Sequence, residues 1–355
     1  MVGRLDHLTQ NDNPLSPTSA QTVMTRVHGL LHCICVTSQV CRRFFEGSRL
    51  TVEPLPIMQD ASGEFAGVCT VQLEQPGKPV VVLDHELIRR LELTLRSVPR
   101  SALGVVLASA SDRVFVAGAD LKAFTELDDS QLERYLAFGS TVFGMLSAFP
   151  FPTVAAINGA ALGGGLELAM HCDGLVAAPA RSRDGQPPKP YPIGLPEAGL
   201  CICPGWGGTN LLPARMDESE AIRRTATGQV MNFDQASAAG LFDAVAPSQE
   251  HLIPAAKSWI LEARSKGRLE RDGAPLRWSG RPDKAPRVLA ALESVRDDCM
   301  STEHERAVIE AVDAGLSRGW QASLEVERRQ LIRLRHTPAA RDAIGAFFAK
   351  APAKK

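Results

Sequence analysis

The sequence has little net charge, no paired cysteines and no long apolar run. Its 39 Lys and Arg residues nearly balance 40 Asp and Glu residues, so the formal net charge is −1. No global basic field would draw the protein onto nucleic acid or an anionic membrane, and we expect neither as a partner. Eight cysteines occur without a C-x-x-C pair, which argues against a secreted disulfide framework and favours a reducing compartment. The longest apolar stretches are too short or too rich in small residues to span a bilayer.

The N-terminal segment shows no targeting pattern. Residues 1–17 lack a cationic start followed by a hydrophobic region, so we expect no signal peptide and a cytoplasmic location. Residues 1–50 are expected to form an appendage, either a packed helix or a disordered segment. A metal cluster of His28, His32, Cys33 and Cys35 is the alternative, but their spacing fits no common zinc pattern.

Residues 51–250 are predicted to form an α/β core, because short β-branched runs alternate there with helical stretches. The predicted strands are residues 68–73, 104–108, 153–157 and 174–178, and the predicted helices are residues 84–98 and 131–149. Residues 251–355 are predicted to be helical, with apolar stripes over residues 304–316 and 320–334 and charge on the other face. We expect its apolar faces, including Phe347 and Phe348, to pack on residues 51–250 or on a neighbouring subunit. Residues 267–286 are predicted to be an exposed connection, because Gly, Pro, Arg and Asp are frequent there.

A glycine triplet, Gly163 to Gly165, precedes the helix formers of residues 166–170. Glycines at the start of a helix let the backbone approach a ligand and present free N–H groups at the positive end of the helix dipole, where an oxyanion is stabilised. Tight packing of a strand against a helix is the alternative explanation. The spacing is not that of a dinucleotide fingerprint, so a nicotinamide cofactor is disfavoured.

Two further stretches contain candidate residues of a binding or catalytic site. A second glycine turn, A-G-A-D-L-K at residues 117–122, also follows an apolar run, and two such turns could place two amides around one thioester oxygen. I-G-L-P-E at residues 193–197 is followed by P-G-W-G-G-T at residues 204–209. Glu197 would ordinarily be a surface carboxylate, whereas Glu167 has apolar neighbours and is a candidate for a buried, functional carboxylate.

Together with A-L-G-G-G-L-E-L-A at residues 161–169, these motifs resemble the crotonase (enoyl-CoA hydratase/isomerase) superfamily, in the same order along the chain. The resemblance covers residues 67–246, and within the superfamily it is closest to the hydratase part of multifunctional fatty-acid oxidation α-subunits. It implies an α/β fold, a spiral of ββα units with C-terminal helices that mediate trimer contacts. It also implies a coenzyme A thioester as substrate, no permanently bound cofactor and no metal, with a homotrimer or a dimer of trimers as the assembly.

By motif position, the resemblance implies an oxyanion hole at the backbone N–H groups of Ala119 and Gly164. The superfamily's two hydratase acids fall on Glu167 and Glu197, and glutamate fills both positions. We assign Glu167 to activate water and Glu197 to give a proton to the α carbon, as a pair that titrates together. The other residues expected around the substrate and its CoA part are Ala117, Gly118, Asp120, Lys122, Gly163 and Trp206.

The resemblance favours enoyl-CoA hydration but leaves other functions open. Other crotonase reactions are Δ3,Δ2-enoyl isomerisation, thioester hydrolysis and C–C cleavage, and a non-catalytic, RNA-associated protein of the same fold is the alternative outside catalysis. Residues 181–192, R-S-R-D-G-Q-P-P-K-P-Y-P, exceed the usual spacing before Glu197. They either modify the acyl pocket or an interface, or form a tolerated surface insertion. His171 is expected to be a satisfied interior histidine.

Overall fold

A computed structural model describes residues 52–350, apart from residues 79, 183–187 and 268–269. The predicted appendage of residues 1–50, with the His/Cys alternative within it, lies outside the described residues. The strands are β1 (Ile57–Gln59), β2 (Val68–Leu73), β3 (Gly104–Ser109), β4 (Val114–Val116), β5 (Thr153–Ile157), β6 (Ala160–Leu162), β7 (Gly174–Ala177), β8 (Pro192–Gly194), β9 (Met231–Asn232) and β10 (Ala244–Val245).

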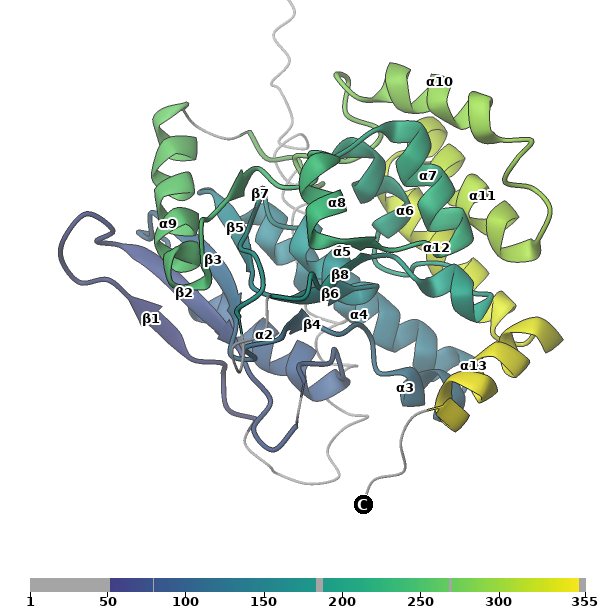
Figure 1. Ribbon diagram of the computed structural model, residues 1–355, viewed down its shortest axis with the longest axis horizontal. Coiled ribbons are helices and arrows are strands. Elements are labelled where there is room, and N and C mark those ends of the chain that lie inside the picture. Colours follow the sequence, from purple (N-terminus) through teal and green to yellow (C-terminus); the bar gives the residue numbers. More distant parts are fainter. Residues whose placement is uncertain (1–51, 79, 183–187, 268–269, 351–355) are drawn as a thin grey trace, which may run out of the picture. The chain divides into compact units, whose positions relative to one another are not determined.

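Helices connect the strands and make up the C-terminal part (Figure 1). The α-helices are α2 (His85–Ser97), α3 (Leu121–Glu126), α4 (Asp129–Ala148), α5 (Gly164–Met170), α6 (Gly208–Leu211), α7 (Glu218–Thr227), α8 (Phe233–Ala238), α9 (Gln249–Ser265), α10 (Ala285–Val295), α11 (Glu303–Arg318), α12 (Trp320–Leu334) and α13 (Pro338–Lys350). Two 3₁₀ turns are η1 (Glu197–Leu200) and η2 (Leu212–Ala214). Among the described helices, none is long and apolar enough to cross a lipid bilayer.

The longer predicted elements are confirmed. The four predicted strands are β2, β3, β5 and β7, and the two predicted helices are α2 and α4. Helix α4 begins at Asp129, two residues before the predicted start, because Asp128 caps it: the Asp128 carboxylate accepts from the Gln131 N–H, and the Gln131 side chain accepts from the Asp128 N–H. The apolar pattern alone does not show this cap, which adds a polar first turn to the helix.

The larger sheet has the order β1-β2-β3-β5-β7-β10 and is parallel except for β1. Its side chains alternate between two apolar layers, as the two-residue period of a strand requires. On β3, Val106 and Ala108 pack with Ile260 of α9, whereas Val105 and Leu107 face the main core. Helix α9 therefore covers one face of this sheet (Figure 1), and the other face packs into the main core.

The smaller sheet has the order β4-β6-β8-β9, and its first three strands are parallel. Along the chain, β3 is followed by β4, β5 by β6, and β7 by β8, so these three strands of the large sheet each lead into a strand of the small sheet. These short strands are not apparent in the sequence pattern, because two or three residues carry no readable period. Their importance is positional, since each ends at one of the sequence motifs.

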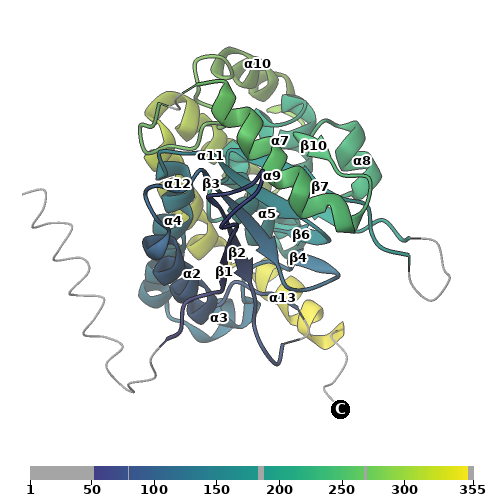
Figure 2. The ribbon, with the colours of Figure 1, turned by 90° about the vertical axis from the view of Figure 1, so that its left-hand side faces the viewer.

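The C-terminal helices α10 to α13 follow the last strand, and among the described residues no strand occurs after β10, as predicted. Helix α13 lies beside α3 (Figure 2), where Phe124 and Phe347 line the same cavity. The prediction that residues 267–286 form an exposed connection is wrong. Trp278 and Ser279 are buried, and Arg271 forms a two-point ion pair with buried Asp173, so this segment packs into the structure.

We predict that Arg271→Ala lowers the free energy of unfolding by about 3 kcal/mol, because it leaves the Asp173 carboxylate buried without its cation. Arg271 also donates to the Phe151 carbonyl at 3.1 Å, so the change removes both contacts. The control is Arg333→Ala, whose pair with Glu303 is exposed and should contribute less than about 1 kcal/mol. Urea denaturation measures both, and equal losses for the two variants would contradict a structural role for the buried pair.

Candidate active site

Three turns that are far apart in the sequence meet at one edge of the small sheet. Strands β4, β6 and β8 are parallel neighbours, so their carboxyl ends lie together. Residues 117–120 follow β4, Gly163 follows β6, and Leu195 to Glu197 follow β8. The Gly163 N–H donates to the Gly194 carbonyl at 2.9 Å, which extends the pairing into the second and third turns. The three motifs therefore surround one point.

The Ala119 amide points away from its neighbouring strand. The Gly118 carbonyl accepts from the Leu83 N–H, and the Asp120 N–H donates to the Leu83 carbonyl. Because successive groups of an extended chain alternate in direction, the Ala119 N–H between them faces the other way. Ala119 lines a cavity. Within the described part of the chain, its N–H has no backbone acceptor.

Gly164 is the first residue of α5 and lines the same cavity. Its N–H is one of the amides that have no partner within a helix, and the described residues provide no other acceptor for it. A Cβ at Gly164 would lie 2.3 Å from the Trp206 ring, and a Cβ at Gly163, where φ is +51°, would lie 2.5 Å from Glu197 Oε1. The glycines thus permit close packing and also leave an amide free, so the two explanations of the triplet are compatible.

Glu167 lies on the first turn of α5, with 1% of its surface exposed, and borders the cavity. Its Oε1 accepts from the N–H groups of Trp206 and Gly208, at 2.8 Å each. Burial raises the pKa of this carboxyl well above its usual range, and the nearby charges of Glu327 and Glu197 add to the effect. The two amide donors oppose it and fix the direction of the side chain.

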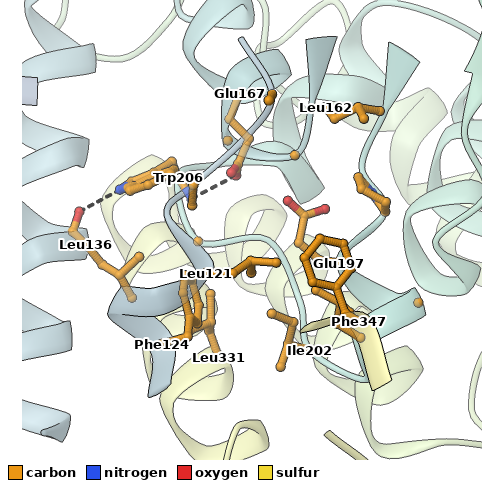
Figure 3. A pocket seen from close by; sticks show the side chains of 18 residues that line it. Leu121, Phe124, Leu136, Leu162, Glu167, Glu197, Ile202, Trp206, Leu331 and Phe347 are labelled. Atoms are coloured by element: carbon orange, nitrogen blue, oxygen red, sulfur yellow. Dashed lines mark hydrogen bonds between the residues drawn. The ribbon is translucent and has the colours of Figure 1, made fainter. Parts of the chain in front are cut away.

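Glu197 begins η1 and faces Glu167 across the cavity (Figure 3). Its Oε2 is buried and has no hydrogen-bond partner among the described residues. Burial and the negative charge of Glu327 raise the pKa of Glu197 to about 8, against the opposing effect of its own backbone N–H. This pKa favours the protonated form at neutral pH, and because the pKa of Glu167 is raised as well, the two carboxyls titrate as a pair.

The cavity between these groups has a volume of about 400 Å³. The two carboxyls and the glycines form one side, and the opposite side is apolar (Figure 3). Its apolar wall comes from α3, α4, the segment after η1, α12 and α13, and includes Leu121, Phe124, Leu136, Ile202, Leu331 and Phe347. A cavity of this kind suits a ligand that places a hydrocarbon part against the apolar wall and one polar group against the N–H groups of Ala119 and Gly164.

Trp206 both borders the cavity and packs the turn. Its ring is 1% exposed, and its Nε1–H donates to the Leu136 carbonyl of α4 at 2.9 Å. His171 donates from Nε2 to the Trp206 carbonyl at 2.9 Å. Burial lowers the pKa of His171 to about 4, so the imidazole is neutral. Its predicted place in the interior is confirmed, but its Nδ1 has no hydrogen-bond partner among the described residues, so it is only partly satisfied.

The remaining predicted residues occupy different places. Ala117 lines the cavity, whereas Gly118, Asp120 and Lys122 do not. The Asp120 carboxylate accepts from the Lys122 N–H at 3.0 Å, at the start of α3. Lys122 is exposed on α3. Their predicted contacts with the CoA part of a substrate stay predictions.

Glu327 is a third buried carboxylate, behind the cavity, that was not predicted from the sequence. It lies in α12 and accepts from the N–H groups of Gly207 and Thr209. Its position interrupts the apolar stripe formed by Trp320, Leu324, Leu331 and Leu334, so the prediction of charge only on the other face is wrong at this residue. A glutamate within an apolar stripe was the signal that could have identified it.

The predicted insertion is only partly described, because residues 183–187 lie outside the described residues. Its last part is anchored: Tyr191 is buried and its hydroxyl donates to the Ala178 carbonyl at 2.7 Å. At the other end, Arg181 lies 3.7 Å from Glu250 of α9 in an exposed ion pair. Its effect on the acyl pocket or on an interface stays a hypothesis.

No group of three or more potential metal ligands of the His, Cys, Asp or Glu type occurs in the part of the chain that the structure describes. The five described cysteines are free, and four of them are buried. Cys203 contacts the Glu327 carbonyl through its thiol at 3.6 Å. The groups available for chemistry at the cavity are therefore carboxyls and backbone amides.

The comparisons with known proteins give matches to enoyl-CoA hydratases and isomerases. The sequence profile described as enoyl-CoA hydratase/isomerase matches residues 63–270. An enoyl-CoA hydratase from Bacillus anthracis is 24% identical, with a TM-score of 0.52, over 84% of this chain and 97% of that one. Human mitochondrial delta3-delta2-enoyl-CoA isomerase is 20% identical, with a TM-score of 0.59, over 84% and 97% of the two chains. At these identities the solved structures establish similarity of fold alone.

We predict that Glu197→Gln raises Tm by roughly 5 °C at pH 8 and by less at pH 5. A carboxyl with a raised pKa in the folded state stabilises the fold below its unfolded pKa of about 4.5, and this contribution is lost as the pH rises to about 8. Glutamine stays neutral throughout. Thermal unfolding of wild type, this variant and the exposed control Glu293→Gln measures the effect, and a difference that does not grow with pH would contradict it.

Proposed function

Because the chain belongs to the enoyl-CoA hydratase/isomerase family, the crotonase superfamily, we propose that it is an enoyl-CoA hydratase. The predicted α/β crotonase fold, with two mixed sheets and C-terminal helices, is confirmed. The observation that carries the proposal is the pair of cavity carboxyls, buried Glu167 and partly buried Glu197, facing one another beside two free amides (Figure 3). Hydration needs two such groups, one for the water and one for the α carbon.

In the proposed reaction, the thioester oxygen accepts hydrogen bonds from the N–H groups of Ala119 and Gly164. These donors stabilise the enolate charge that develops as water attacks. The water oxygen forms a bond to the β carbon while its proton passes to Glu167. The protonated Glu197 gives its proton to the α carbon, and the π bond between the two carbons is lost. Transfer of the proton from Glu167 to Glu197 restores the starting state.

The distribution of hydrogen-bond donors supports these roles. Two backbone amides hold Glu167 Oε1, which favours its ionised form for accepting a proton from water. Glu197 Oε2 has no donor among the described residues, and its pKa of about 8 favours the protonated form at neutral pH. Once Glu197 is neutral, its charge no longer opposes ionisation of Glu167. Because the pKa of Glu167 is also raised well above its usual range, the proposal assigns the role of base to Glu167 on its two amide donors and not on its pKa.

Other reactions of the family use the same kind of oxyanion site, so the fold does not decide among them. Δ3,Δ2-Isomerisation is the main competitor, and it moves one proton without adding water. Two carboxyls on the cavity favour hydration over a reaction that needs a single acid. Incubation with 2-enoyl-CoA and 3-enoyl-CoA thioesters separates the two: isomerisation without hydration would contradict the proposal.

The family supports an acyl-CoA substrate and no resident cofactor. We further propose that the enzyme acts in fatty-acid oxidation in the cytoplasm, as a homotrimer or a dimer of trimers, with residues 251–355 providing subunit contacts and a cover for the site. Phe347 of α13 lies on the cavity wall, which supports a role of residues 251–355 in covering the site. Closeness to the hydratase part of multifunctional α-subunits stays a prediction from the motifs.

We predict that Glu167→Gln and Glu197→Gln each lower kcat for hydration by about 100-fold or more, since positioned acids and bases typically contribute that much. Glutamine keeps the shape of glutamate but cannot exchange the proton. Loss of the conjugated-enoyl absorbance of short and medium 2-enoyl-CoA thioesters measures hydration, with Glu293→Gln of α10 as the control. Near-normal turnover in either variant would remove that residue from the mechanism.

We also predict that kcat for hydration falls as the pH rises above about 8. Glu197 must carry a proton to donate it, and a carboxyl with a pKa of about 8 loses that proton in this range. Steady-state rates between pH 6 and pH 10, at saturating substrate, measure the effect. A kcat that stays constant up to pH 10 would show that Glu197 does not act as the acid.

A further inference from the structure

The turn of residues 206–209 is shared between two carboxylates. The N–H groups of Trp206 and Gly208 donate to Glu167 Oε1, at 2.8 Å each. Those of Gly207 and Thr209 donate to Glu327, at 2.5 and 3.0 Å. Gly207, with φ +102°, lies in the left-handed region, and its conformation lets successive amides point to opposite sides. Glu167 from α5 and Glu327 from α12 therefore hold the turn between them.

Glu327 has the hydrogen bonds of an ionised carboxylate. It has no exposed surface, and it receives a third hydrogen bond from the Thr209 hydroxyl. That hydroxyl also accepts from Asn210 Nδ2. Burial raises the pKa of Glu327, and the hydrogen bonds from Thr209 and Gly207 oppose this rise. Three donors stabilise the negative charge against the cost of burial.

We infer that Glu327 is a positioning residue of the proposed hydratase site. It fixes the 206–209 turn against Glu167 and, in its ionised form, adds a negative charge behind the two cavity carboxyls. The inference rests on the proposed function for its catalytic meaning. Glu327 does not line the cavity, so it acts through the turn and through its charge and does not contact the substrate.

The charged and titratable groups around Glu327 explain the effect of its charge. Glu167 on α5, Glu197 on η1 and the Cys203 thiol face it, and Arg328 is the nearby cation on its own helix. After burial, the Glu327 charge is the next cause that raises the pKa of Glu167, and it also raises that of Glu197. Glu327 thus helps to keep the proton on Glu197 at neutral pH.

Three variants separate charge from geometry. Glu327→Gln removes the charge at constant size. We expect the high-pH limb of the pH–kcat profile, where kcat falls as Glu197 loses its proton, to shift to lower pH by about one unit. At pH 8 this is a several-fold loss of kcat relative to wild type, with little change in KM. Glu327→Asp keeps the charge but shortens the side chain, so kcat should fall at every pH while the limb stays in place. Glu325→Gln, an exposed glutamate of the same helix, should match wild type.

A second readout does not depend on turnover. Infrared difference spectra between each protein and its Glu197→Gln counterpart report the C=O band of the protonated Glu197 carboxyl. The intensity of this band as a function of pH gives a titration midpoint, the pH at which half of the Glu197 carboxyls are protonated. We expect the midpoint to be lower in the Glu327→Gln background than in wild type. If wild type hydrates no enoyl-CoA but the midpoint moves, the proposed function is wrong and the coupling stands.

An unchanged midpoint and an unchanged limb in folded Glu327→Gln would overturn the inference. If Glu327→Gln does not fold, Glu327→Met supplies a second neutral side chain of similar length. Failure of both neutral variants to fold, while Glu327→Asp folds, would mean that the carboxylate serves folding alone, and this outcome also overturns the inference. Circular dichroism and Tm establish which variants are folded before the pH series.

Discussion

Parallel pairing of the three short strands β4, β6 and β8 determines where the candidate site lies. Each strand has only three residues, yet each ends at a turn that carries part of the site. The pairing of Leu162 with Gly194, continued by the hydrogen bond from Gly163 N–H, brings Glu197 against Gly163. A shift of one residue between β6 and β8 would turn these side chains to the other face of the sheet. The large sheet and its two apolar layers hold this register in place.

Burial of three carboxyls in one region is the electrostatic consequence of that arrangement. Glu327 receives three donors, Glu167 two from the same turn, and Glu197 Oε2 none within the described residues. Burial raises the pKa of all three carboxyls, and each donor opposes that rise by stabilising the negative charge. Replacing the protonated member by a neutral side chain should stabilise the protein and remove the proposed acid. Stability and the proposed activity thus conflict at Glu197, as is common at functional sites.

The sequence allowed the long elements to be predicted because these have local signals, whereas Glu197 was identified only through the motifs of the resemblance. A six-residue apolar run such as β2 and an amphipathic stripe such as α2 each show their own period. Strands of three residues show none, so β4, β6 and β8 were missed. The connection before α10 was predicted to be exposed from its composition, but the ion pair between Arg271 and Asp173 buries part of it. Tertiary partners about 100 residues away leave no mark in a local window.

The C-terminal helices contribute more than a cover to this site. The family profile matches residues 63–270, yet Glu327, Leu331 and Phe347 lie beyond that range. Two of these line the cavity, and the third holds the turn that orients Glu167. Because related folds offer similar oxyanion donors to several acyl-CoA reactions, the placement and protonation of the acids must distinguish those reactions. In this chain both properties depend partly on α12, so a substitution in a C-terminal helix could alter the chemistry while every motif of the core is kept.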